Sequence, residues 1–165
     1  MSIFKLRTNL VEKIKCFGNN LYPALKKPLE ELSLPTRDMS DSLSKVLSVD
    51  ASKICQKINV NNLENLGCIV EPVHSARSAL DKLSSSYQVI LLDVNLPDCS
   101  IYLLINLIRS DVGNVNQKTP IVLTSSWLNK SYKKIYLDLG VNEIYIKPIQ
   151  KTDFKRILQN YGVIT

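Results

Sequence analysis

The sequence predicts an α/β domain built on a doubly wound, five-stranded parallel sheet over residues 45–165. Short apolar runs alternate with segments of helical periodicity, which is typical of βα units that build a parallel sheet. The run Tyr87–Leu92 is almost continuously apolar, as expected for a central strand that is buried on both faces. A chain of 165 residues accommodates one such domain with an extension, but not two full domains.

The five units are expected in order along this part of the chain. The strands are expected at Lys45–Val49, Cys68–Val73, Tyr87–Leu92, Pro120–Leu123 and Glu143–Ile146. The first helix is expected to begin after a Ser52 cap, to carry Ile54, Ile58 and Leu66 on one side, and to stop at Gly67. The other helices are expected from a Ser75 cap to Leu83, over Ser100–Arg109, over Asn129–Leu139, and from Thr152 to near Gly162.

Residues 1–44 follow a different pattern and are expected to form a helical extension and a linker. Apolar residues recur at three- and four-residue spacing from Ile3 to Phe17, which predicts an amphipathic helix. A second short helix is expected at about Tyr22–Leu32, before a polar stretch at Ser33–Ser44. The sequence leaves open whether this extension packs on the following domain, mediates dimerisation or binds a separate partner.

Composition excludes several classes of function. The formal net charge of +6 is spread along the chain, and the cluster of Lys130, Lys133 and Lys134 is interpreted as a solvated helix face. No helix-turn-helix pattern is present, so no nucleic-acid partner is expected. No apolar run reaches the ~20 residues that span a bilayer, and no signal peptide is recognisable, so a cytoplasmic protein without membrane contact is expected. The four cysteines are interpreted as reduced thiols.

Polar side chains follow four of the expected strands. They are Asp50, Asp93, Thr124 with Ser125, and Lys147. Ligands of a parallel α/β sheet bind beyond the carboxyl ends of its strands, so two carboxylates, a hydroxyl and an amine are expected to converge there. This set suits phosphorylation of an aspartate, in which a carboxylate attacks phosphorus while a metal, a hydroxyl and an ammonium group stabilise the anionic oxygens. Magnesium suits such an all-oxygen site.

Four segments make the chain resemble the CheY-like receiver domain of response regulators and hybrid histidine kinases. They are VLSVDASKICQKINVNNLENLGC at residues 46–68, VILLDVNLPD at 89–98, TPIVLTSS at 119–126 and IYIKPI at 144–149. The resemblance covers the chain from about residue 45 to its end, and it implies a flavodoxin-like fold. It also implies a phosphodonor, which is a histidine kinase or a histidine phosphotransfer domain.

The resemblance assigns roles to five residues. Asp93 is the implied phosphoacceptor, Thr124 the hydroxyl that bonds the phosphoryl group, and Lys147 its ammonium partner. The implied ligands of magnesium are Asp50, Asp93 and the backbone carbonyl of Asn95. The family often has a cis peptide bond after the lysine, where this chain has Pro148.

Two positions depart from the family pattern. Ala51 stands where the family has a second acid that ligates the metal, so magnesium is expected to bind about ten- to a hundredfold more weakly. With Ala51 beside it, Asp50 is interpreted either as a metal ligand or as a helix cap. Ile144 replaces an aromatic residue that many members carry, and Tyr145 is expected to point to the other face of the sheet.

Two functions remain open after these observations. The first, which the sequence favours, is a phosphorylatable receiver that signals by protein contact without an output domain, and the second is a degenerate pseudo-receiver that acts as a phosphorylation-independent interaction module. Either could bind a protein target through residues 1–44 or the face around Trp127, whose ring is expected to be exposed or to lie under its loop. His74 is interpreted as structural or solvated. An enzyme with a separate substrate is not expected.

Overall fold

The computed structural model describes residues 44–165, which form a five-stranded parallel sheet with helices on both faces. The strands are β1 (Lys45–Val49), β2 (Ile69–Val73), β3 (Val89–Asp93), β4 (Ile121–Ser125) and β5 (Glu143–Ile146). The helices are α2 (Lys53–Glu64), α3 (Ala76–Lys82), α4 (Ile101–Ser110), α5 (Lys130–Asp138) and α6 (Lys151–Asn160). The expected α/β fold is confirmed, whereas the helices expected at 3–17 and 22–32 lie outside the described residues.

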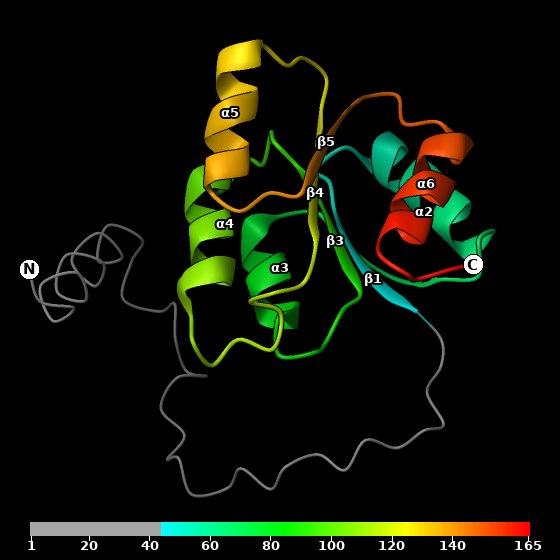
Figure 1. Cartoon of the computed structure of the whole chain (residues 1–165), viewed down its shortest axis with the longest axis horizontal. Helices are drawn as coiled ribbons and strands as arrows, with labels where there is room; N and C mark the ends of the chain where they lie inside the picture. Colours follow the sequence, from blue (N-terminus) through cyan, green and yellow to red (C-terminus); the bar gives the residue numbers. More distant parts are fainter. Residues whose placement is uncertain (1–43) are drawn as a thin grey trace, which may run out of the picture. The chain divides into compact units, whose positions relative to one another are not determined.

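The sheet has the strand order β2-β1-β3-β4-β5, so the chain changes its winding direction between β1 and β3. Helices α3, α4 and α5 cover one face of the sheet, and α2 and α6 cover the other (Figure 1). Each face has its own apolar core, with Leu104 and Ile105 fully buried on the first and Phe154 and Leu158 on the second. Because both faces are covered, strands β3 and β4 are buried along their whole length.

The starts and ends of the helices follow local signals in the sequence. The Ser52 side chain accepts a hydrogen bond from the Cys55 amide at 3.3 Å, and Ser75 accepts one from the Ser78 amide at 3.1 Å, so both expected N-caps are confirmed. Gly67 has a φ of 85°, which is why the chain can turn sharply after α2 before it enters β2.

The side of α2 that carries Ile54 and Ile58 is not the buried face of this helix. Ile54 and Ile58 are 75% and 44% exposed, whereas Gln56 and Asn59 are buried. The Gln56 amide group donates to the carbonyl oxygens of Ser48 at 2.8 Å and Val73 at 2.7 Å, and its oxygen accepts from the Ser48 hydroxyl at 2.6 Å. A polar side chain therefore occupies the interface with β1 and β2 because the strands offer it three partners.

Strand β4 extends two residues beyond its expected end. Thr124 and Ser125 lie inside the strand rather than after it, and Thr124 is the register partner of Asp93, the last residue of β3. Because of this extension, Thr124 is paired directly with Asp93 at the edge of the sheet where the candidate site lies.

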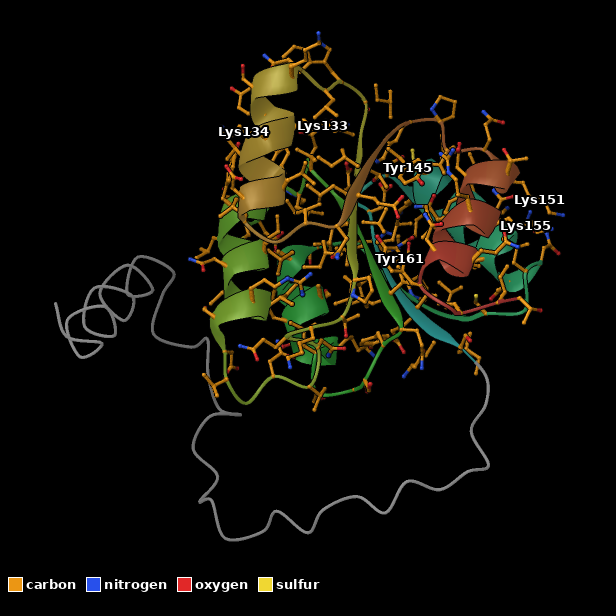
Figure 2. All side chains as sticks on the ribbon, viewed as in Figure 1. Lys133, Lys134, Tyr145, Lys151, Lys155 and Tyr161 are labelled. Carbon is orange, nitrogen blue, oxygen red and sulfur yellow. The ribbon has the colours of Figure 1, made fainter. Side chains whose placement is uncertain are left out.

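The described surface carries charged side chains, and no helix in it suits a membrane. No helix in residues 44–165 is long and apolar enough to cross a membrane. Lys133 and Lys134 project from α5, and both are exposed, as expected for a solvated helix face (Figure 2). Within the same range the cysteines are free thiols.

Candidate functional site

Three charged side chains from three strands meet at the carboxyl edge of the sheet. Asp50 follows β1, Asp93 ends β3, and Lys147 follows β5. The Lys147 Nζ atom lies 2.8 Å from Asp50 Oδ2 and 3.0 Å from Asp93 Oδ2. Asp50 is 0% and Asp93 5% exposed, so the ammonium group bridges two buried carboxylates.

The backbone around each carboxylate holds the second oxygen. Asp50 Oδ1 accepts a hydrogen bond from the Ser52 amide at 2.9 Å, and Asp93 Oδ1 accepts one from the Asn95 amide at 3.3 Å. Each carboxylate therefore turns one oxygen toward its own loop and the other toward Lys147. The N-cap of α2 is Ser52, so the interpretation of Asp50 as that cap is wrong.

The two hydroxyl groups of β4 lie beside this charge cluster. Thr124 is 1% exposed, and its Oγ1 donates to the Leu92 carbonyl oxygen at 3.4 Å, which is a long hydrogen bond. Ser125 is buried, and its hydroxyl bonds the backbone of Trp127. The Thr124 hydroxyl is thus adjacent to Asp93 but is turned toward β3, and a change of χ1 rotamer would redirect it.

The position of Lys147 depends on the backbone that carries it. Its amide donates to the Ser125 carbonyl oxygen at 2.8 Å, and the Lys147-Pro148 peptide bond is cis, as the resemblance implied. Burial alone would lower the pKa of the Lys147 ammonium group, but the hydrogen bonds and charges of Asp50 and Asp93 outweigh burial and raise that pKa above its ordinary value. The lysine is therefore charged at every physiological pH.

The donor set is of the kind that magnesium prefers. Two buried carboxylates and the Asn95 carbonyl, which lies two residues after Asp93, offer only oxygen ligands, so they fit a hard divalent cation that keeps several waters. Residues 44–165 contain no cluster of three or more His, Cys, Asp or Glu side chains that could hold a metal ion. The set therefore has fewer charged ligands than a three-carboxylate site.

Sequence comparison identifies the family. The model of the response regulator receiver domain matches residues 46–159. The chain belongs to this family. Its solved relatives include the chemotaxis response regulator CheY4 of Vibrio cholerae, with a TM-score of 0.66 and 25% identity over 72% of this chain and 98% of that one.

Curated relatives of this receiver are much longer proteins. The hybrid signal transduction histidine kinase L of Dictyostelium discoideum is 30% identical over 131 residues, which are 76% of this chain and 8% of the kinase. The osmosensing histidine protein kinase Sln1 of Saccharomyces cerevisiae is 27% identical over 75% of this chain and 10% of its own length. The chain thus spans a tenth or less of these two relatives.

A further solved structure bears on the metal. The receiver domain of a sensor histidine kinase from Pseudomonas aeruginosa has a magnesium ion coordinated in its active site cleft. It has a TM-score of 0.65 and 24% identity over 72% of this chain and 97% of that one. At this identity the likeness shows the shared fold alone.

The departure at Ile144 is visible in the packing of this receiver. Ile144 packs against the core formed with α3, α4 and α5, whereas Tyr145 packs on the opposite face against the α6 core. The Tyr145 hydroxyl donates to Glu143 Oε2 at 2.6 Å. The expectation that Tyr145 points away from the face of Ile144 is confirmed, and Tyr145 does not replace the family's aromatic residue.

Two further residues touch the loops of the site: His74, whose interpretation as structural or solvated agrees with its contact, and Asp98, which sequence reasoning missed. His74 Nδ1 lies 3.0 Å from the Asp50 carbonyl oxygen, and the Asp98 carboxylate accepts hydrogen bonds from the first amides of α3. No local pattern predicts either contact, because each joins residues that are more than twenty positions apart.

Trp127 is 66% exposed and meets the Tyr132 ring edge-on. Of the two expectations for its ring, the exposed one is therefore confirmed.

Proposed function

We propose that this receiver accepts a phosphoryl group on Asp93 from the phosphohistidine of a histidine kinase or a histidine phosphotransfer domain, and that it signals by protein contact. The observation that carries the proposal is the placement of one ammonium group within 3.0 Å of two buried carboxylates. Burial of two like charges is costly, and clusters of buried ionisable groups are concentrated at functional sites.

The proposed reaction divides the work among three residues. An Asp93 carboxylate oxygen forms a bond to phosphorus while the bond from phosphorus to the donor imidazole nitrogen breaks, and that nitrogen leaves with the electron pair. The Lys147 ammonium group, which lies 3.0 Å from Asp93, moves into contact with a phosphoryl oxygen and stabilises its negative charge. Thr124 rotates from the Leu92 carbonyl oxygen and donates its hydrogen bond to the phosphoryl group.

Asp50, Asp93 and the Asn95 carbonyl would hold magnesium, which supplies positive charge beside the phosphoryl oxygens when it is bound. The residues of this chain prepare that place before the donor arrives. The Ser52 and Asn95 amides orient the carboxylates, and burial limits the access of water to Asp93. Because Ala51 carries no acid, we expect the site to need more magnesium than a site with three carboxylates.

A second candidate function is a degenerate pseudo-receiver that binds a protein target independently of phosphorylation. Ala51 and Ile144 favour it, because they remove a metal ligand and the family's aromatic reporter of the active state. The exposed Trp127 is the observation that gives such a module a contact residue, in addition to the expected role of residues 1–44. The Lys147 bridge between Asp50 and Asp93 argues for the first function, since an interaction module has no need of it.

Intact mass spectrometry after incubation with phosphoramidate and magnesium separates the two functions. A working receiver gains one phosphoryl group, and Asp93→Asn abolishes the gain. Asp111→Asn, at an exposed position in the turn after α4, is the matched control and should gain the group as the wild type does. A folded wild-type protein that gains nothing at high magnesium would favour the pseudo-receiver.

A further inference from the structure

The loop between β3 and α4 carries the backbone carbonyl that the proposed function assigns to magnesium. At its start the Val94 amide donates to the Thr124 carbonyl oxygen at 2.9 Å, which continues the pairing of β3 with β4. Residues 94–100 then form no helix or strand until α4 begins at Ile101. The direction of the Asn95 carbonyl therefore depends on what holds the loop after it.

Asp98 attaches this loop to the start of α3. Its Oδ1 accepts a hydrogen bond from the Ala76 amide at 2.9 Å, and its Oδ2 accepts one from the Arg77 amide at 2.9 Å. The N-cap of α3, Ser75, already serves the Ser78 amide. Asp98 thus accepts from the two first-turn amides that the cap leaves over, and a carboxylate there is favoured by the charge-assisted bonds and by the helix dipole.

The same corner of the fold also touches the loop of the other carboxylate. Directly before α3, His74 Nδ1 lies 3.0 Å from the Asp50 carbonyl oxygen, and the Asp50 amide donates to the Val73 carbonyl oxygen at 3.1 Å. The junction of β2 and α3 is therefore bonded to the Asp50 loop on one side and, through Asp98, to the Asp93 loop on the other. The β2–α3 junction thus connects the two loops through hydrogen bonds.

We propose that Asp98 is a positioning residue for the magnesium-dependent phosphorylation of Asp93. By fastening the loop to α3, Asp98 fixes the Asn95 carbonyl at the place from which it ligates the metal. The inference rests on the proposed function and deepens it. Residues behind a metal ligand commonly change metal affinity by about ten- to a hundredfold, and with Ala51 in place of an acid the carbonyl supplies a larger share of the ligands.

The test compares Asp98→Ala with two other variants. Asp98→Asn keeps one acceptor and loses the charge, and Ser75→Ala removes the cap of α3 but leaves the bonds of Asp98 intact. Magnesium affinity is measured directly, from the shifts of the Asp93 and Asn95 amide signals in ¹⁵N-labelled protein, and circular dichroism checks folding. The second readout is the phosphoramidate reaction, as the magnesium concentration for half-maximal rate and as the rate at saturating magnesium.

We expect Asp98→Ala to raise the magnesium dissociation constant and the half-maximal concentration about tenfold, with less than a twofold change in the saturated rate. Asp98→Asn should fall between Asp98→Ala and the wild type, and Ser75→Ala should leave both constants unchanged. If Asp98→Ala does not fold, Asp98→Asn against Ser75→Ala carries the comparison.

Three results would overturn the inference. The first is an unchanged magnesium affinity in Asp98→Ala, and the second is an equal loss in Ser75→Ala, which would make the role purely structural. The third is an equal loss of magnesium affinity in Asp98→Ala and Asp98→Asn that disappears at 0.5 M KCl. Because this salt concentration screens charges over about 4 Å, such a loss would be a through-space charge effect. A wild type that binds magnesium but gains no phosphoryl group would remove the proposed function, whereas the affinity data would still decide the role of Asp98 in metal binding.

Discussion

Replacement of Lys147 by methionine removes the ammonium group that contacts both buried carboxylates of the site. Methionine has a similar length and an apolar side chain, so the packing of the lysine stem is largely kept. The carboxylates of Asp50 and Asp93 stay behind at 0% and 5% exposure, with their shared positive partner gone. We expect a large loss of stability that comes from unbalanced charge.

The magnitude follows from the contacts. Removal of one partner of a buried ion pair costs about 3–5 kcal/mol. The lower end applies here, since each carboxylate keeps one amide donor, from Ser52 and from Asn95. A loss of about 3 kcal/mol in a domain of this size lowers Tm by about 12 °C.

Urea and thermal unfolding of the full chain, followed by circular dichroism, measure this loss. Lys151→Met is the matched control, because Lys151 lies on the exposed surface of α6 and its loss should change stability by less than about 0.5 kcal/mol (Figure 2). Added Asp50→Asn should restore more than about 1 kcal/mol to Lys147→Met, since it removes one of the unpaired charges. Millimolar magnesium should raise the Tm of Lys147→Met more than that of the wild type.

The reasoning fails if Lys147→Met is destabilised by less than about 1 kcal/mol, which is what a surface ion pair costs. It fails equally if Asp50→Asn destabilises Lys147→Met further. Either result would mean that water already balances the charge of Asp50 and Asp93, and the bridge would then be a poor guide to function.

Three further predictions test other parts of the structure. Ala51→Asp should tighten magnesium binding by about ten- to a hundredfold in isothermal titration calorimetry, because it adds one charged ligand; Ala51→Asn is the neutral control, and an equal gain there would contradict the charge argument. Burial, with Tyr102 adding to it, raises the pKa of Tyr136 to about 12, so the stability linked to this phenol is complete below about pH 10 and is lost as the pH rises through 12. Tyr136→Phe should therefore show a shallower loss of unfolding free energy between these pH values in urea titrations, and equal slopes would refute the assignment. Gln56→Leu should cost about 2–3 kcal/mol in urea unfolding, because it leaves the buried Ser48 hydroxyl without its acceptor and removes two hydrogen bonds to strand carbonyls, whereas Ile54→Gln on the exposed face should cost almost nothing.

Local sequence patterns were sufficient for the elements that local physics determines. The bounds expected for β1 and β5 agree with the structure, as do the Ser52 and Ser75 caps, because alternation, capping and glycine stops act over a few residues. The convergence of Asp50, Asp93 and Lys147 was also predictable, since the carboxyl ends of parallel strands meet at one edge.

The features that the sequence could not predict depend on distant partners. Apolar spacing favoured Ile54 and Ile58 as residues on one side of α2, yet the carbonyls of Ser48 and Val73 draw Gln56 to the interface. Asp98 is another case, because its carboxylate oxygens accept hydrogen bonds from amides that precede it by more than twenty residues. Such contacts depend on how loops meet in the fold, and periodicity carries no information about them.

The charge balance of the site gives the proposed phosphorylation a way to proceed with Ala51 in place of an acid. Two carboxylates and one ammonium group give the resting site a net charge of −1, whereas a third carboxylate in place of Ala51 would make it −2. A less negative site attracts a divalent cation less, which weakens magnesium binding. It also repels an anionic phosphodonor less, which favours the approach of the donor. Ala51→Asp should therefore lower the magnesium requirement of phosphorylation without raising the magnesium-saturated rate. A rise in both would mean that the second acid does more than hold the metal.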